Sequence, residues 1–268
     1  MSFLKTPGLK TASALALSVA ASSAAAQPEH SVIELRQYTL HPGQRDTLIA
    51  LFDREFVESQ EALGIRIVGQ FRDLDRPDMY VWLRSFADMP ARAEGLGGFY
   101  FGPVWQTHRH TANATLTDSD NVLLLKPLWP GAGFRPDPAP RRPPGVNGAG
   151  QGLIMLKIQY LNADIEPARL NDLARRLTPV LAKAGGPVEA WLTAEPSPNN
   201  FPRLPVRQGE HVLVSVTRFA DQLAYDAYLE RLGKSPAFNA LAAEAEAISA
   251  KPAEGLRLQP TARSKLHG

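Results

Sequence analysis

Four residues whose side chains bind anions or stack on ligands lie in two pairs. Arg36 and Tyr38 are two positions apart in one apolar stretch, and Trp82 and Arg84 are two apart in another. Residues two apart on a β-strand point to the same face, so each pair is predicted to present its side chains together. Guanidinium groups hold carboxylates bidentately and aromatic walls exclude water, which predicts a site for a carboxylate or an enolate-like ligand. The alternative is that the four residues form cross-strand pairs or surface salt bridges.

Trp105 and His108 extend this set, because residues three apart share one face of a helix. The candidate ligand-binding residues are therefore Arg36, Tyr38, Trp82, Arg84, Trp105 and His108. His108 could serve as a catalytic group or hold haem, and the alternative is an ordinary packed or solvated histidine. His110 would point nearly opposite to His108, so no metal site is predicted for this pair. No cofactor is predicted, with haem as the alternative, and the chain has no Gly-rich phosphate loop, GxSxG or HExxH motif.

The chain contains the same series of residues twice. Phe86-Ala87-Asp88, Trp105 and Leu123 recur 133 positions later as Phe219-Ala220-Asp221, Phe238 and Leu256. Earlier in each copy the sequence suggests an offset of 122, which matches Tyr38 with Tyr160 and Gly64 with Gly186. The difference falls in the Pro/Asn-rich stretch 195–210. A repeat of this length is a small domain, so the sequence predicts a fused pair of like halves.

The candidate residues are concentrated in the first half. At the 133 offset, Trp82, Arg84 and His108 become Ser215, Thr217 and Leu241. At the 122 offset, Arg36 becomes Ile158 and Gln70 becomes Leu192. This asymmetry predicts a site in the first half, with the second half as its structural partner. Arg84→Ala or His108→Ala is then expected to abolish binding without unfolding, and truncation of Leu173 or Leu177 to cost about 2–5 kcal/mol of stability.

Both halves show the same order of strand and helix patterns. In the first half, strands are predicted at 32–40, 65–71, 79–86 and 121–126, with a helix before Gly64. A second helical region follows the N-cap Asp88 to about residue 115, with breaks at Gly95, Gly97, Gly98 and Gly102-Pro103. In the second half, strands are predicted at 153–161 and 255–259 and a hairpin within 188–219. Pro179 is expected to kink or divide the first helix of this half.

The order β-α-β-β-α-β is that of ferredoxin-like domains, which leave one face of their sheet bare. We therefore predict an α+β fold of two tandem ferredoxin-like halves, packed sheet to sheet as a pseudo-dimeric α/β barrel. The last strand of each half is expected to complete the sheet of its neighbour. The predicted domains are 30–128 and 152–262, joined by a Pro/Gly-rich linker at 129–151.

Residues 1–26 are typical of a secretory signal peptide, with Lys5 and Lys10 before a short apolar run and a small-residue cleavage site ending at Ala26. The predicted product is a periplasmic or secreted protein that begins at Gln27, with no integral membrane segment. Without the leader, the chain has 27 basic and 27 acidic side chains. This balance indicates no nucleic-acid partner. The absence of Cys excludes thiolate metal sites and Cys nucleophiles.

The segments ELRQYTLHPG, VWLRSFADM, GPVWQTHRHTAN and NVLLLKP resemble the NIPSNAP family. The resemblance is strong over 32–128 and weaker over 153–260. It implies the dimeric α/β barrel fold, and it implies no reaction, since members of the family have no generally accepted catalytic activity. The best-described members are mitochondrial proteins discussed as adaptors. Cofactor-free monooxygenases, haem-handling enzymes and lactone isomerases share the barrel fold, which by itself does not transfer a function.

Two functions follow as hypotheses. The resemblance favours an exported NIPSNAP-like protein that acts as an interaction or adaptor protein with a protein partner. The alternative is a protein that binds a small carboxylate or aromatic ligand, or a cofactor-free monooxygenase- or isomerase-like enzyme, with its site in the first half. The binding hypothesis predicts that the six candidate side chains converge on a pocket between sheet and helices. The interaction hypothesis predicts that they are packed or scattered, with an exposed apolar patch elsewhere.

Overall fold

Each half contributes four strands and the helices between them. The computed structural model describes residues 1, 29–146 and 148–268. The first half contains β1 Val32–Leu40, α1 Arg45–Leu51, the π-helical turn η1 Phe52–Phe56, α2 Val57–Glu61, β2 Arg66–Asp73, β3 Met79–Phe86, α3 Met89–Tyr100, α4 Pro103–Asn113 and β4 Leu116–Pro127. The second contains β5 Leu153–Leu161, α5 Pro167–Lys183, β6 Val188–Ala194, β7 Val212–Phe219, α6 Gln222–Gly233, α7 Pro236–Ala247 and β8 Ser249–Pro260.

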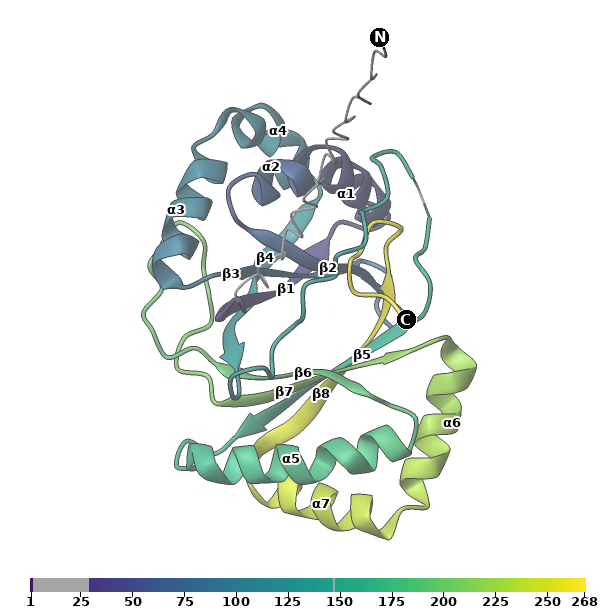
Figure 1. The fold of residues 1–268 in the computed structure, drawn as a ribbon. Helices are drawn as coiled ribbons and strands as arrows, with labels where there is room; N and C mark the ends of the chain where they lie inside the picture. The colour runs from purple at the N-terminus through teal and green to yellow at the C-terminus, as the bar shows by residue number, and fades with distance from the viewer. Residues whose placement is uncertain (2–28, 147) are drawn as a thin grey trace.

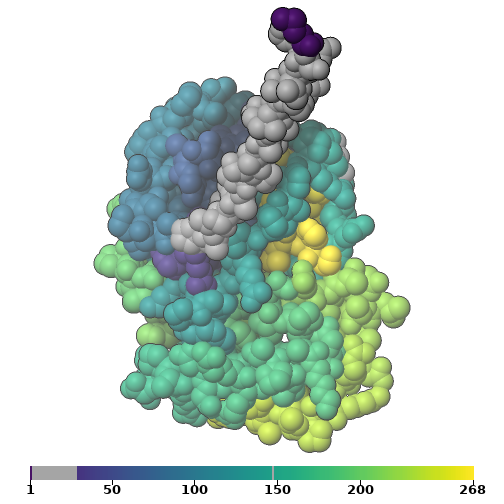
Figure 2. All heavy atoms as spheres, in the orientation of Figure 1, coloured from purple at the N-terminus to yellow at the C-terminus, as the bar shows by residue number. Residues whose placement is uncertain are grey.

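The eight strands of the described residues form one closed antiparallel barrel in the order β1-β3-β2-β8-β5-β7-β6-β4. The last strand of each half pairs with the other half: β4 runs antiparallel to β6, and β8 runs antiparallel to β2. The helices of the two halves cover opposite outer sides of the barrel (Figure 1). Figure 2 shows the two halves as two stacked lobes. The predicted α+β fold and the crossing of the last strands are confirmed.

Alternation along the strands decides which side chains enter the barrel. Ile33 and Leu35 of β1 lie in the same apolar cluster as Ile154 and Leu156 of β5, and this cluster fills the barrel interior. Successive side chains on a strand point to opposite faces, so Glu34, which lies between Ile33 and Leu35, faces the helices. The space between sheet and helices therefore receives the polar residues of β1 and β3.

The strand pairing shows which residues of the first half correspond to which residues of the second. This correspondence differs from the predicted one. Arg36 pairs with Trp82 across β1 and β3, and Lys157 pairs with Ser215 across β5 and β7. Since Trp82 and Ser215 correspond at the 133 offset, Arg36 corresponds to Lys157 and not to Ile158. The same register matches Glu34 with Met155 and Tyr38 with Gln159. The predicted offset of 122 was wrong by one residue, and on a strand such a slip exchanges the two faces.

Three details of the helices also differ from prediction. Gly95, Gly97 and Gly98 lie inside α3 and do not break it. A Cβ on Gly95 would lie 2.9 Å from the Ile65 side chain, so this glycine lets α3 approach the sheet. The helical region breaks only around Gly102, where α4 begins with Pro103. Helix α5 is not divided at Pro179.

The predicted linker is partly built into the fold. Ala132 is buried and exchanges two backbone hydrogen bonds, both 2.9 Å, with Trp129 and Trp191, and Phe134 packs against the cluster inside the barrel. The predicted domain boundaries stay a prediction. The predicted signal peptide lies outside the described residues, apart from Met1. None of the helices in the described ranges has the length and apolarity that a bilayer crossing needs.

Candidate functional site

Three arginines converge on one carboxylate between the sheet and the helices of the first half. Glu34 Oε2 accepts hydrogen bonds from Arg36 Nη1 and Arg84 Nε, both at 2.7 Å, and Glu34 Oε1 accepts one from Arg92 Nε at 2.7 Å. All four side chains are 0–1% exposed. β1 and β3 bring Glu34 opposite Arg84 as a cross-strand pair, and α3 adds Arg92 from above. We call these four residues the arginine cluster.

The arginine cluster keeps its carboxylate ionised. Burial by itself raises the pKa of Glu34, but the charges of Arg84, Arg36 and Arg92 together outweigh it and hold the pKa well below its ordinary value. Further acceptors serve the guanidinium groups: Gln60 Oε1 lies 3.0 Å from Arg84 Nη1, and Tyr38 Oη lies 2.9 Å from Arg36 Nε. These arginines are thus bound by groups of the protein itself, which is the packed arrangement of a structural cluster.

The aromatic candidates lie beside the arginine cluster around a small cavity. Trp82 is 2% exposed, and the guanidinium carbons of Arg36 and Arg84 lie 5.6 and 5.0 Å from its ring centre. Trp82, Tyr38 and Trp105 line a cavity of about 90 Å³, together with Phe52 and Phe56 of the π-helical turn η1. This is less than the roughly 150 Å³ of an engineered cavity that accommodates benzene.

The six predicted site residues therefore have three different surroundings. Tyr38, Trp82 and Trp105 line the small cavity. Arg36 and Arg84 lie behind it, bound to Glu34. His108 is 28% exposed and lies with its Nε2 3.5 Å from Glu55 Oε2. They lie in one region, but they do not line one ligand-sized pocket.

The second half closes over the first. In Figure 1 the loop between β6 and β7 extends along α3. Its Asn199 and Asn200 accept hydrogen bonds from Arg92 Nη1 at 3.1 and 2.7 Å, and Asn200 Nδ2 donates to the Met89 carbonyl at 2.6 Å. Phe201 lies 5.9 Å from the Tyr100 ring. The stretch 195–210, noticed in the sequence only as an insertion, completes the environment of the arginine cluster.

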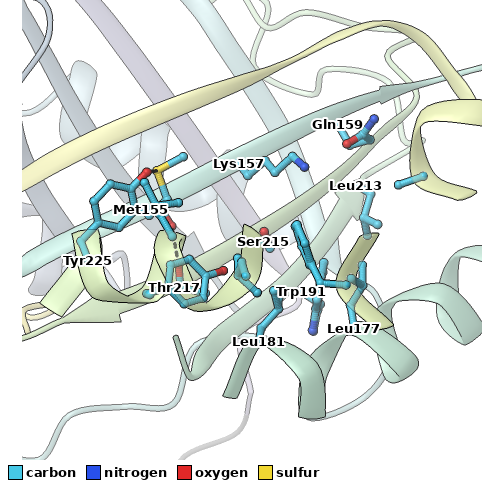
Figure 3. Close-up of a pocket in the computed structure, with 15 residues that line it drawn as sticks. Met155, Lys157, Gln159, Leu177, Leu181, Trp191, Leu213, Ser215, Thr217 and Tyr225 are labelled. Carbon is cyan, nitrogen blue, oxygen red and sulfur yellow. Dashed lines mark hydrogen bonds between the residues drawn. The ribbon is translucent and has the colours of Figure 1, made fainter. Parts of the chain in front are cut away.

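A larger pocket lies between the sheet and the helices of the second half. It has a volume of about 190 Å³ and is lined by β5, β6 and β7 on one side and by α5, α6 and α7 on the other. Most lining residues are apolar or aromatic, including Leu177, Leu181, Trp191, Tyr228 and Phe238. Figure 3 shows the side chains of Met155, Lys157 and Gln159 from β5 with Ser215 and Thr217 from β7 in this pocket. We call it the second-half pocket.

The second-half pocket takes the place that the arginine cluster occupies in the first half. The barrel register matches Glu34 with Met155 and Arg36 with Lys157, and the 133 offset matches Trp82 with Ser215 and Arg84 with Thr217. Indole and guanidinium groups are replaced by two small hydroxyl side chains. The space is consequently filled by the protein in the first half and open in the second.

Lys157 is the one charged residue among the described residues that line this pocket. No ion pair or hydrogen bond holds its amine in the described part of the chain. The Lys157 side chain is exposed in the pocket. The surrounding protein atoms partly desolvate the amine and lower the pKa of Lys157, and the negative charge of Glu246 partly opposes this effect. Gln159 is engaged with Ser249, and Thr217 Oγ1 donates to the Met155 carbonyl at 3.3 Å. The pocket thus offers apolar walls, one cation, the Ser215 hydroxyl and the hydroxyls of Tyr225 and Tyr228.

Glu34 and Arg92 of the arginine cluster and the whole second-half pocket were not predicted from the sequence. Glu34 lies two positions from Arg36, so the same strand alternation predicts that they share a face. The second-half pocket was hidden by the one-residue slip, which matched Arg36 with the barrel-facing Ile158. Sequence alone gives no sign of Arg92, because α3 meets β1 only in the folded chain.

Two other features of the described residues lack the properties of a ligand site. A groove of about 430 Å³ runs beside the start of α5 and the loop 195–210, but its charged Arg207 and Glu210 are paired at 2.6 Å. His108 does not fit a haem ligand, because the nearby cavity of about 90 Å³ cannot hold a macrocycle. Within the described ranges, no three His, Cys, Asp or Glu side chains are grouped to hold a metal ion.

Comparisons with known proteins support the fold and the assignment of the first half. The NIPSNAP family model matches residues 33–129. An anthrone oxidase-like protein of known structure matches with 14% identity and a TM-score of 0.54, over 91% of this chain and 98% of its own. A proposed monooxygenase from Lactobacillus acidophilus matches with 14% identity and a TM-score of 0.52, over 88% of this chain and 97% of its own.

A NIPSNAP-like domain protein from Burkholderia xenovorans is 25% identical, with a TM-score of 0.34, over 43% of this chain and 93% of its own. A search of curated proteins found no match. At these identities the two barrel structures that match almost the whole chain show a shared fold and no activity. Both the family model and the segments ELRQYTLHPG to NVLLLKP lie in the first half of the barrel. The similarity to the NIPSNAP family therefore covers residues 33–129 of this chain.

Proposed function

We propose that the protein binds a small, mainly aromatic or apolar molecule in the second-half pocket. The observation that carries this proposal is the open, apolar space of about 190 Å³ with Lys157 at its wall, for which the described residues provide no ion-pair partner. This volume exceeds that of an engineered cavity of roughly 150 Å³ that accommodates benzene. Apolar walls with a few polar groups are typical of ligand pockets. The similarity in fold to proteins named as monooxygenases agrees with a small organic ligand and does not identify a reaction.

Filling the pocket tests this proposal. Ser215 corresponds to Trp82, whose indole ring fills this space in the first half. We therefore expect Ser215→Trp to fill the second-half pocket and to abolish binding of small aromatic compounds. The measurement is a thermal-shift screen followed by isothermal titration, since a ligand of the folded state raises its stability. Leu223→Trp is the matched control, because Leu223 is 77% exposed on α6 and does not line the pocket. Binding that survives Ser215→Trp would contradict the proposal.

The proposed function requires no cofactor. The screen therefore also includes haem and divalent metals, so that binding of a cofactor would be detected. A melting temperature raised by haem in the wild-type protein and not in His108→Ala would support the haem alternative from the sequence. A cofactor-free enzyme remains within the proposal, with the bound molecule as its substrate. The described residues that line the pocket provide one cation and the hydroxyl groups of Ser215, Thr217, Tyr225 and Tyr228, and no carboxylate is among them.

An interaction protein is the second candidate, and one observation favours it. Helix α6 exposes Leu223 and Leu229, at 77% and 46% of their surfaces. Exposed leucines on one helix can contribute to a protein interface. Sedimentation velocity of the wild-type protein and of Leu223→Ser at increasing concentration tests whether this helix mediates self-association.

We further propose that the chain is exported after cleavage behind Ala26 and that its two halves arose by duplication. The basic start and the short apolar run support export. The equal order of strands and helices in both halves supports duplication. Mass spectrometry of the native protein tests the first proposal, with Gln27 as the expected first residue.

A further inference from the structure

A cationic side chain occupies the same position in both halves of the barrel, but among the described residues only the first half has a carboxylate beside it. In the first half, Arg36 is neutralised by Glu34 at 2.7 Å from the same strand. In the second half, Lys157 takes the position of Arg36, and the position of Glu34 holds Met155. The second half thus has a cation at the position of Arg36 and a methionine at the position of Glu34.

The surroundings of Lys157 leave room for an anion. Met155, Ser215 and Thr217 are smaller or less polar than the corresponding Glu34, Trp82 and Arg84, and they open the second-half pocket around the amine. Glu246 of α7 acts on Lys157 through its charge but forms no ion pair with it within 4.0 Å in the described structure. Lys157 is exposed in the open pocket, so its ammonium is accessible to a bound anion.

We propose that the ligand of the second-half pocket is a small aromatic or apolar monocarboxylate, whose carboxylate pairs with Lys157 in the manner of the Glu34–Arg36 pair. This inference rests on the proposed function and specifies its ligand class. The apolar part of the molecule lies against Leu177, Leu181 and Phe238, and the carboxylate also accepts a hydrogen bond from the Ser215 hydroxyl. No bond is made or broken in this step.

The test compares acids with their neutral amides. The probes are benzoate, phenylacetate and 3-phenylpropanoate, each with the corresponding primary amide, titrated calorimetrically into the full-length protein. We expect at least one acid to bind about tenfold or more tightly than its amide, since hydrogen bonds to charged groups are stronger than neutral ones. Lys157→Met should remove this preference, and Lys157→Arg should retain it. Lys183→Met is the matched control, because it removes an exposed lysine of α5 that does not line the pocket.

A second variant supplies the missing carboxylate from the protein. Met155→Glu recreates the Glu34–Arg36 arrangement beside Lys157, so it should abolish binding of the acid and leave binding of the amide. Equal affinities for acid and amide in the wild-type protein would overturn the carboxylate inference and leave the proposed function intact. A preference for the acid that persists in Lys157→Met would also overturn it. If no acid or amide binds the wild-type protein, the proposed function fails, and the inference fails with it.

Discussion

At the scale of single residues, the arginine cluster shows that a polar side chain predicted to bind a ligand can instead be buried and have a structural role. Arg84 was predicted to line an accessible site, where its removal would cost little stability. The structure corrects this expectation, because Arg84 is 0% exposed and bound to Glu34 and Gln60. For Leu177 the prediction differs in the other direction. Leu177 was predicted to have only a structural role, but it also lines the second-half pocket.

Breaking the arginine cluster should destabilise the fold. Arg84→Ala leaves Gln60 Oε1 without its donor and creates a cavity beside Trp82, while Glu34 keeps Arg36 and Arg92 as partners. An unsatisfied buried polar group costs about 1–3 kcal/mol, and the cavity adds to this cost. We expect Arg84→Ala to lower the free energy of unfolding by about as much as the core truncation Leu173→Ala. Urea denaturation of both variants measures this, with Arg54→Ala as the control for an arginine that is 58% exposed. An Arg84→Ala protein as stable as the control would show that the cluster contributes little to stability.

Glu34 also makes the stability depend on pH. Its pKa in the folded state is lowered below the ordinary value of 4.5. A lowered folded pKa contributes stability above the unfolded pKa, and this stability is lost as the pH falls from about 4.5 towards the folded pKa. We expect Glu34→Gln to be less stable than the wild type at pH 7 and to lose less stability between pH 5 and pH 3. Urea denaturation at several pH values checks both expectations, and parallel curves for the two proteins would contradict them.

Binding at Lys157 should depend on pH in the opposite direction. A carboxylate ligand requires the protonated amine, and partial desolvation lowers the pKa of Lys157. Affinity for an acid probe should therefore fall as the pH rises through this lowered pKa. The facing Tyr225 and Tyr228 have raised pKa values, that of Tyr228 to about 12, so they stay neutral over most of this range. Titrations between pH 6 and pH 10 measure the effect, and Lys157→Arg should flatten it.

At the scale of elements, periodicity predicts most strands and helices, and contacts between elements decide the rest. β1 and β3 have the predicted bounds, because their apolar runs end at turn residues. Asp88 accepts a hydrogen bond from the Ala91 amide at 2.8 Å, as the predicted N-cap does. The predicted breaks within α3 were wrong, because Gly95 and Gly98 lie close to Ile65 and Leu63, and this contact is not visible in the sequence of α3. The second-half pocket depends on the correspondence between β1 and β5, which the predicted offset of 122 misplaced by one residue.

The loop between β6 and β7 is expected to stabilise the first half. Asn199 and Asn200 are acceptors for Arg92, which is 0% exposed. An unsatisfied buried donor costs about 1–3 kcal/mol. We expect the double substitution Asn199→Ala and Asn200→Ala to lower the free energy of unfolding by a few kcal/mol. Asn171→Ala on the exposed surface of α5 is the control, and equal stability of the two variants would contradict the expected role of the loop.

At the scale of the whole molecule, the crossing of β4 and β8 makes each half incomplete. The pairs β4–β6 and β2–β8 join edges that would otherwise be unpaired, and the apolar cluster inside the barrel combines residues of both halves. Residues 29–146 produced alone would expose two strand edges and one apolar sheet face. We expect this fragment to form dimers, which sedimentation equilibrium would detect. A stable monomeric fragment would contradict this expectation.

The covalent connection of two unlike halves has a consequence for how the protein can change over generations. In a barrel made of two identical chains, every mutation alters both helix-covered spaces at once. Here a substitution at Ser215 leaves Trp82 untouched, so one space can be filled for stability while the other accumulates changes in ligand preference. The first half can remain a stable scaffold with its arginines bound internally. Selection for a new ligand would then act on the second half alone.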